Sequence, residues 1–149
     1  MKIALKGLVV IELLKDGKVI DRIKNRNLVL QSSENIFCNL IAGANQANNT
    51  ITSIALGTGN TPPKITDTAL ENEVARVPVT GYTFLSTNSV EFDALVDQNT
   101  ASGNVIQELG LYTAGNVLFA RTVLTTPINK DSTFSFNIKW ILNISLASA

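Results

Sequence analysis

The sequence predicts an all-β domain, either an antiparallel β-sandwich or a partly closed barrel, of about eight strands with one short helix. Apolar and polar residues alternate with a period of two through most of the chain after residue 50. Turn-forming residues recur about every 8 to 12 positions, as they do between the short strands of all-β domains. The sequence contains no βαβ alternation, internal repeat or long linker, so its 149 residues are expected to form one domain.

The first predicted element is a β-hairpin. Residues 8–14 and 19–23 are rich in β-branched and other large apolar side chains. The short segment between them contains Asp16-Gly17, a dipeptide that favours a tight hairpin turn. We therefore expect residues 1–30 to form a hairpin region at the start of the domain.

One segment, residues 32–43, has helical rather than strand spacing. Ser32 or Ser33 can cap its first turn, and Gly43 can end it. The lone Cys38 is expected to be a small buried hydrophobe on this helix, because the chain has no histidine to activate it as a nucleophile. Residues 44–50 are polar and without period, which predicts a surface loop. The apolar side chains of the helix are Ile36, Phe37, Leu40 and Ile41.

Strands and hairpins account for the rest of the chain. Residues 51–56 alternate as a strand, residues 82–85 and 90–96 form a predicted hairpin, and residues 105–111 and 117–123 form another. The last strand, residues 134–144, has the clearest alternation in the chain, so we expect it to lie at the centre of the core. The large side chains that share one face of this strand are Phe134, Phe136, Ile138, Trp140, Leu142 and Ile144.

Composition excludes several classes of function. The 12 Lys and Arg residues balance 12 Asp and Glu residues, so the chain lacks the positive surplus typical of nucleic-acid binding. With no histidine and one cysteine, it has no zinc cluster, no disulfide framework and no Ser-His or Cys-His catalytic pair. No apolar run approaches the ~18 residues of a membrane span. We therefore expect no enzymatic activity, no cofactor, no metal and no membrane association.

Two motifs resemble chemical sites but are better explained as structure. Residues 57–63 follow a strand with two nearby glycines, as a dinucleotide-binding loop does, but they lack the third glycine and contain two prolines. We expect a tight turn there. Residues 67–71 resemble a capped helical turn, and Glu91 and Asp93 alternate with the apolar residues of a strand. These carboxylates are expected to face solvent rather than form an acid–base pair.

Positive charge is concentrated at the start of the chain, since residues 1–30 contain seven basic residues and three acidic residues. They are predicted to be solvated charges that protect the strands from aggregation. Alternatively, residues 1–30 form an interaction arm that docks on an acidic partner surface. The seven cations are Lys2, Lys6, Lys15, Lys18, Arg22, Lys24 and Arg26.

Three charged residues lie within or beside apolar strands. Glu108 and Arg121 lie on the two strands of one predicted hairpin, so they can pair across it. Lys130 lies in the turn before the last strand. Their charges are expected either to fix strand register as ion pairs or to contribute to an interface between subunits.

A set of short motifs, in this order and spacing, resembles structural proteins of tailed bacteriophages. Similar signatures occur in the virion-attachment domains of tail fibres and in small accessory virion proteins. The motifs are residues 54–59 (IALGTG), 67–73 (DTALENE) with Arg76, 90–92 (VEF), 107–112 (QELGLY), 118–121 (LFAR) and 128–130 (INK).

The resemblance implies a non-enzymatic β protein, often a homotrimer, that assembles in the bacterial host cytoplasm and is built into the virion. Two locations follow: decoration that cements the capsid, or a small tail, baseplate or fibre-attachment component. Its partners would be copies of itself, as a trimer or hexamer, and other virion proteins. Residues 44–50 and 97–104 are the loops that would reach a host-surface receptor. The alternative is a carbohydrate-binding or hydrolytic β-sandwich, which needs an exposed aromatic platform or two carboxylates in one cleft.

Overall fold

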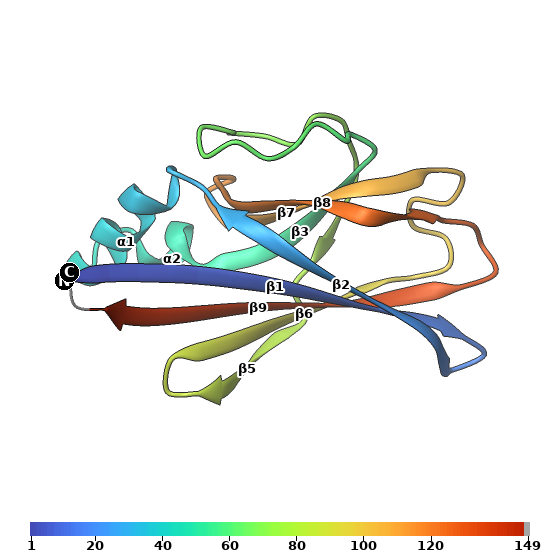
Figure 1. Cartoon of the computed structure of the whole chain (residues 1–149), viewed down its shortest axis with the longest axis horizontal. Helices are drawn as coiled ribbons and strands as arrows, with labels where there is room; N and C mark the ends of the chain where they lie inside the picture. Colours follow the sequence, from blue (N-terminus) through green and yellow to red (C-terminus); the bar gives the residue numbers. More distant parts are fainter. Residues whose placement is uncertain (148–149) are drawn as a thin grey trace.

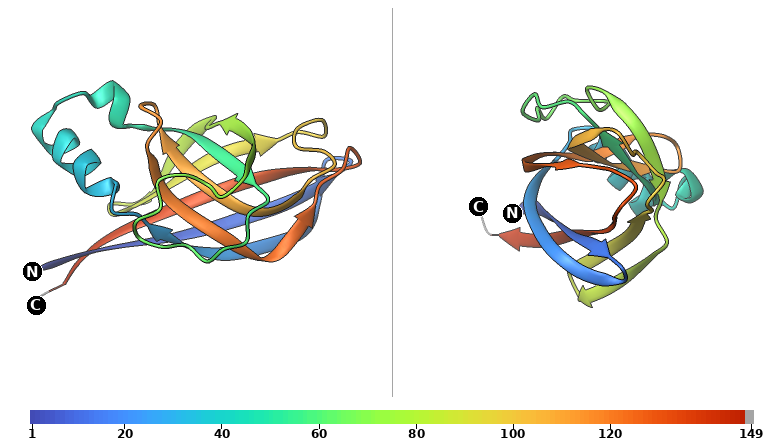
Figure 2. Two further views of the ribbon diagram at one scale, coloured as in Figure 1. Left: turned by 90° about the horizontal axis from the view of Figure 1, so that it is seen from above. Right: turned by 90° about the vertical axis from the view of Figure 1, so that its right-hand side faces the viewer.

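The computed structural model describes residues 1–147, and it confirms the all-β class (Figure 1). Nine strands in this part of the chain form one antiparallel sheet, in the order β4-β3-β7-β8-β2-β1-β9-β6-β5. The sheet curls so that its two halves face each other, but it does not close into a barrel (Figure 2). The strands are β1 (Lys2–Lys15), β2 (Lys18–Val29), β3 (Ile51–Gly57), β4 (Glu73–Pro78), β5 (Gly81–Ser86), β6 (Ser89–Val96), β7 (Val105–Thr113), β8 (Leu118–Asn129) and β9 (Ser135–Ala147).

Local sequence explains the three predicted hairpins, all of which are confirmed. β1 pairs with β2 through a turn in which Asp16 and Gly17 both have positive φ, at 51° and 74°. That backbone twist matches the twist of the strands it joins. β5 pairs with β6 and β7 pairs with β8, each antiparallel, as the alternation predicts.

The last strand is central, as the sequence predicts. β9 lies between β1 and β6, and its pairing with β1 runs from Lys2 opposite Ala147 to Leu14 opposite Ser135. Trp140 and Phe136 are fully buried in the main core, where β1 contributes Val9 and Ile11. The opposite half of the sheet covers this core with apolar side chains of β3, β7 and β8.

The basic hairpin at the start of the chain is therefore not a separable arm. β1 is hydrogen-bonded on both sides, to β2 and β9, and its inner face belongs to the core. Removing residues 1–30 would remove a central strand, so the rest of the chain would not be left as a folded core. Contacts made through the cations of this hairpin can use only its outer face and its turn.

The two halves of the sheet meet along a short seam between β2 and β8. Ladder pairing there covers only Leu28 opposite Arg121 and Val29 opposite Ala120, and one further backbone bond runs from the N–H of Leu30 to the carbonyl of Phe119 at 2.9 Å. Beyond these pairs, the Asn25 side chain connects the diverging strands: its amide donates to the carbonyl of Val123 at 2.8 Å and accepts from the backbone N–H of Thr125 at 3.1 Å. A side chain thus replaces ladder bonds that the backbone does not make.

Two helices lie at one end of the sheet, in the connection that leads from β2 to β3 (Figure 1). α1 (Ser33–Ala42) ends at Gly43, which has a left-handed backbone, as predicted. Ser32 does not cap it, because its hydroxyl donates to the carbonyl of Leu118. The segment predicted to be a polar loop contains a second short helix, α2 (Gln46–Asn49).

The predicted inner face of α1 is partly wrong. Ile36 is buried and Phe37 packs edge-on against Phe119, with ring centroids 5.7 Å apart. Ile41, however, is 87% exposed, and Cys38 is exposed rather than buried. The helix covers only the end of the sheet, so a narrow stripe of its surface reaches the core.

A long irregular segment, residues 58–72, connects β3 to β4 and covers the outer face of β3, β7 and β8 (Figure 1). Its residues 67–71 are not the helical turn that the sequence suggests. Leu70 instead packs into a small second core with Leu30, Ala55, Tyr112 and Leu118. We call residues 58–72 the covering loop.

Candidate functional site

The structure brings Glu108 and Arg121 together beneath the covering loop. Arg121 of β8 donates to one carboxylate oxygen of Glu108 of β7 from both Nε, at 3.0 Å, and Nη2, at 2.7 Å. Both side chains are almost fully buried, with residue exposures of 0% and 2%. The ion pair joins the two strands of the hairpin diagonally, since Gly110 rather than Glu108 lies opposite Arg121.

Glu108 also anchors the covering loop. Its Oε1 accepts from the backbone N–H groups of Gly59 (3.1 Å) and Asn72 (2.8 Å), and its Oε2 accepts from that of Glu71 (3.0 Å). Gly59 has no room for a side chain, because a Cβ there would lie 2.7 Å from Oε1. One carboxylate thus satisfies N–H groups at both ends of a loop that has no ladder of its own.

The pKa of Glu108 reflects two opposed effects. Burial alone would raise the pKa of its carboxyl group. The hydrogen bonds from the Asn72 N–H, the Arg121 guanidinium, and the Glu71 and Gly59 N–H groups favour the charged form and hold the pKa below its ordinary value. A general acid needs a carboxyl group that keeps its proton near neutral pH, so Glu108 is suited to structure rather than to acid catalysis.

Arg121 extends the same network toward solvent. Its Nη1 donates to the carbonyl of Thr61 at 3.0 Å and to Oδ2 of Asp67 at 3.1 Å. Asp67 also accepts from the backbone N–H of Lys64, at 2.9 Å, and so tightens a turn of the covering loop. Glu108 and Arg121 were expected either to fix strand register or to contribute to an interface between subunits. Their polar groups are hydrogen-bonded within the chain.

Lys130 is not part of this network. Its ammonium group, 2% exposed as a residue, donates to the carbonyls of Gln98 at 3.0 Å and Asp131 at 2.8 Å. Burial lowers the pKa of Lys130. No carboxylate of residues 1–147 lies within ion-pair distance of it, so its main contribution is to hold the turn that contains residues 97–104 against the start of β9.

All seven basic residues of the first hairpin are exposed. Strand register places three of them, Arg22, Lys24 and Arg26, in a row on the outer face of β2. Alternation along β1 adds Lys2 and Lys6 to the same face, whereas Lys15 and Lys18 flank the turn. We call the outer-facing set on β1 and β2 the basic face.

The charge of this outer surface changes sign across the sheet. Lys24, Val10, Lys139 and Asp93 follow one another in register from β2 through β1 and β9 to β6. Glu12 in the middle is paired with Arg22 at 2.9 Å and Lys139 at 3.3 Å, and the Arg22 hydrogen bond is the main cause that lowers its pKa. The surface therefore presents cations on β2 and carboxylates on β6.

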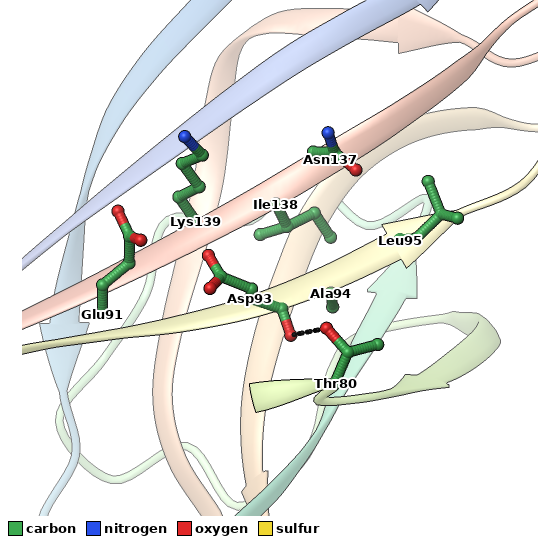
Figure 3. A pocket seen from close by; sticks show the side chains of 8 residues that line it. All are labelled: Thr80, Glu91, Asp93, Ala94, Leu95, Asn137, Ile138 and Lys139. Atoms are coloured by element: carbon green, nitrogen blue, oxygen red, sulfur yellow. Dashed lines mark hydrogen bonds between the residues drawn. The ribbon is translucent and has the colours of Figure 1, made fainter. Parts of the chain in front are cut away.

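The carboxylates of β6 lie beside a shallow depression of about 250 Å³ (Figure 3). Burial, with the nearby charge of Asp93, raises the pKa of Glu91. Lys139 borders the same depression but pairs with Glu12. Two carboxylates do not make a cation site, and residues 1–147 contain no cluster of three or more potential ligands.

A second and larger hollow in this part of the chain is apolar. It has a volume of about 620 Å³ and lies between α1 and the β5–β6 hairpin, where the curled sheet stays open. We call it the apolar groove. Tyr82 and Phe84 form its outer wall, are 65% and 71% exposed, and pack edge-on with centroids 5.5 Å apart. The remaining lining residues include Phe37, Leu40, Ile51, Val90, Phe92 and Leu142.

The apolar groove was not predicted from the sequence. Alternation indicated the β5–β6 hairpin, but not that one face of β5 would lack a covering layer. The sequence does contain one indication of this exposed apolar surface: residues 80–90, which include Tyr82 and Phe84, contain no charged residue.

Comparison of the chain with protein-family models, with curated proteins and with solved structures finds no match. Within residues 1–147, no helix is long and apolar enough to cross a membrane.

Proposed function

We propose that the chain is a non-enzymatic structural protein of a tailed-phage virion. In this proposal it is a homo-oligomeric β protein that either decorates and cements the capsid or forms a small tail or fibre-attachment component. The observation that carries the proposal is the apolar groove with its exposed Tyr82 and Phe84. A contiguous apolar surface on a chain with 16% charged residues favours a protein that functions in an assembly.

The buried polar groups support the same proposal. Glu108, Arg121 and Lys130, the most buried charges of the described residues, hold loops in place through hydrogen bonds inside the chain. A rigid scaffold with fixed loops suits a particle component, because binding surfaces that are already ordered lose little conformational entropy on assembly. The basic face then offers a second surface for an acidic virion partner.

The copy number of the chain in purified virions tests the proposal. Quantitative mass spectrometry would compare its peptides with those of the major capsid protein of the same particles. Hundreds of copies are expected for capsid decoration, and a small multiple of three or six for a tail, collar or fibre component. Absence from the particles would overturn the proposal.

A second candidate is a carbohydrate- or receptor-binding module, which the exposed Tyr82 and Phe84 favour. Aromatic side chains at the rim of a groove are a common feature of sugar-binding sites. In a glycan-binding assay, a Tyr82→Ala variant would then lose affinity while Thr126→Ala, on an exposed part of β8, would keep it. Equal binding by both variants, or no binding by the parent chain, would exclude this candidate.

A further inference from the structure

We propose that β5 is the dimerisation edge of this protein and that its occupant is β5 of a second copy, paired antiparallel about a two-fold axis. This inference deepens the proposed function, on whose homo-oligomeric assembly it rests. The two edges of the sheet differ in their composition.

The edge formed by β4 is protected against pairing. Glu73 and Arg76 form an ion pair on it at 2.7 Å, and Pro78, which has no N–H to donate, ends it. The covering loop leads into this strand, and Arg76 also stacks 3.8 Å from the ring centroid of Tyr112. Charges, proline and a neighbouring loop are the usual means by which natural sheets prevent unwanted strand addition.

The edge formed by β5 has no charge and no proline, and its one irregularity is a register shift against β6 between Phe84 and Ser86. Residues 80–90 contain no charged residue and no proline. Every residue of β5 is exposed, and in residues 1–147 it pairs with β6 alone. An edge strand leaves every second N–H and C=O free to pair with another strand.

The chemistry of β5 fits a copy of itself. In an antiparallel pair about a two-fold axis, each strand meets its own sequence in reverse, so any charged residue near the axis would oppose a like charge. β5 contains none. Centring the axis at Thr83 places Tyr82 opposite the partner subunit's Phe84, and aromatic pairs across neighbouring strands are favourable.

The exposed apolar area is sufficient for such a pair. Tyr82 and Phe84 continue across Val90 and Leu142 to the outer ends of β9 and β1, because register aligns these residues on the inner face of the sheet. The exposed parts amount to roughly 500 Å² of apolar side chain, close to the apolar share of a standard interface of about 800 Å² per partner. The contributing side chains are Ile3, Leu40, Tyr82, Phe84, Ile144 and Leu146.

The proposed symmetry joins the two apolar grooves. A continuous antiparallel sheet formed about a two-fold axis keeps the same face of both copies on the same side, so the two aromatic walls become adjacent. Of the trimer and the hexamer expected from the sequence, only the hexamer can be built from such pairs.

The test is cross-linking at the axis, in a Cys38→Ser background that removes the exposed native thiol. A Thr83→Cys variant is expected to form a disulfide-linked dimer under mild oxidation, because residues opposite each other in a strand pair have the Cα separation that a disulfide requires. A Thr126→Cys variant, on an exposed part of β8, is the matched control and is expected to stay unlinked.

Sedimentation equilibrium supplies the second measurement. The parent chain is expected at twice the mass of one chain in the micromolar range, and a Tyr82→Ser/Phe84→Ser variant is expected to weaken the dimer at least 10-fold while circular dichroism shows an unchanged fold. A parent chain that stays monomeric at ~100 µM overturns the proposal. So does a dimer whose Thr83→Cys form does not cross-link, because its interface then lies elsewhere.

The two tests are independent. A cross-linked dimer that is absent from virions would overturn the virion role and leave the β5 interface standing. If Thr83→Cys in purified particles cross-links to a different virion protein, that protein and not a second copy of this chain pairs with β5. This result would overturn the dimer and leave the virion role standing.

Discussion

Replacing Glu108 with glutamine keeps the shape of the side chain and removes its charge. We expect this change to lower the free energy of unfolding by about 3 kcal/mol. Breaking a buried ion pair on one side typically costs about 3 to 5 kcal/mol, because the other charge is left buried without a partner. The loss should lie at the lower end of this range, because Arg121 keeps its bonds to Thr61 and Asp67, and Asp67 is partly exposed.

Geometry explains why glutamine cannot substitute at this position. Both carboxylate oxygens of Glu108 accept hydrogen bonds, Oε1 from Gly59 and Asn72, and Oε2 from Glu71 and the guanidinium of Arg121. In either orientation of the amide, its NH₂ group would face N–H donors. At least two bonds are therefore lost whichever way the side chain turns.

Urea denaturation with linear extrapolation measures the loss. Glu73→Gln is the matched control, since it makes the same chemical change in an ion pair with Arg76 that is about one-third exposed, and it is expected to cost less than about 1 kcal/mol. Amide hydrogen exchange adds a local measurement: the N–H groups of Gly59, Glu71 and Asn72 should lose protection in the Glu108 variant alone.

Equal losses for the two variants would refute the assignment of Glu108 as the anchor of the covering loop. A double variant, Glu108→Gln/Arg121→Met, sharpens the test. It should cost at least about 1 kcal/mol less than the sum of the two single changes, because no buried guanidinium remains unpaired. Additive losses would mean that the two residues act separately.

Three further predictions concern the loop, the pH dependence and the basic face. Gly59→Ala should lower the free energy of unfolding by about 2 kcal/mol, because the new Cβ would meet the side chains of Glu71 and Glu108. Its control is Gly81→Ala, where a Cβ would meet no atom within 4 Å, and there the change should stay within about 0.5 kcal/mol in thermal or urea unfolding. Because the pKa of Glu108 is held below its ordinary value of 4.5, the folded chain binds that proton less readily than the unfolded chain, and stability is lost as the pH falls through this range. Acid titration of Glu108→Gln should therefore show a shallower loss than the parent below pH ~4.5, and parallel curves would contradict this account. Reversing two charges of the β2 row that make no ion pair, Lys24→Glu/Arg26→Glu, should lower incorporation into virions about 10-fold without changing the fold, and normal incorporation would remove the basic face from the proposed contact.

The sequence predicts most of the strands because their signals are local. Asp16-Gly17 and the alternation around it determine one hairpin without reference to the rest of the chain. β4 was missed because Glu73–Pro78 combines charges with a proline, a composition that suits an edge strand but weakens its pattern. The exposure of Cys38 and Ile41 was missed because helical spacing identifies an apolar stripe but not how much of it the sheet covers.

In the candidate sites, too, contacts between residues close in the sequence are predictable, and contacts between distant segments are not. Glu108 and Arg121 lie 13 positions apart on one hairpin, so their pairing follows from local strand geometry. The bond from Gly59 to Glu108 joins residues 49 positions apart, and no pattern along the chain specifies it. The apolar groove likewise depends on where the sheet stops curling, which is a property of all nine strands together.

The seam between β2 and β8 gives the molecule a direction of mechanical weakness. A force that pulls the two halves of the sheet apart would be resisted by the backbone bonds at Leu28, Val29 and Leu30 and by the side-chain bridge of Asn25. Arg121 lies opposite Leu28 in this seam and also holds the covering loop through Glu108 and Thr61. The covering loop also bridges the seam, because the carbonyl of Ile65 accepts from the backbone N–H of Gln31, which follows β2, at 2.9 Å. Opening the seam would therefore pull on the covering loop as well.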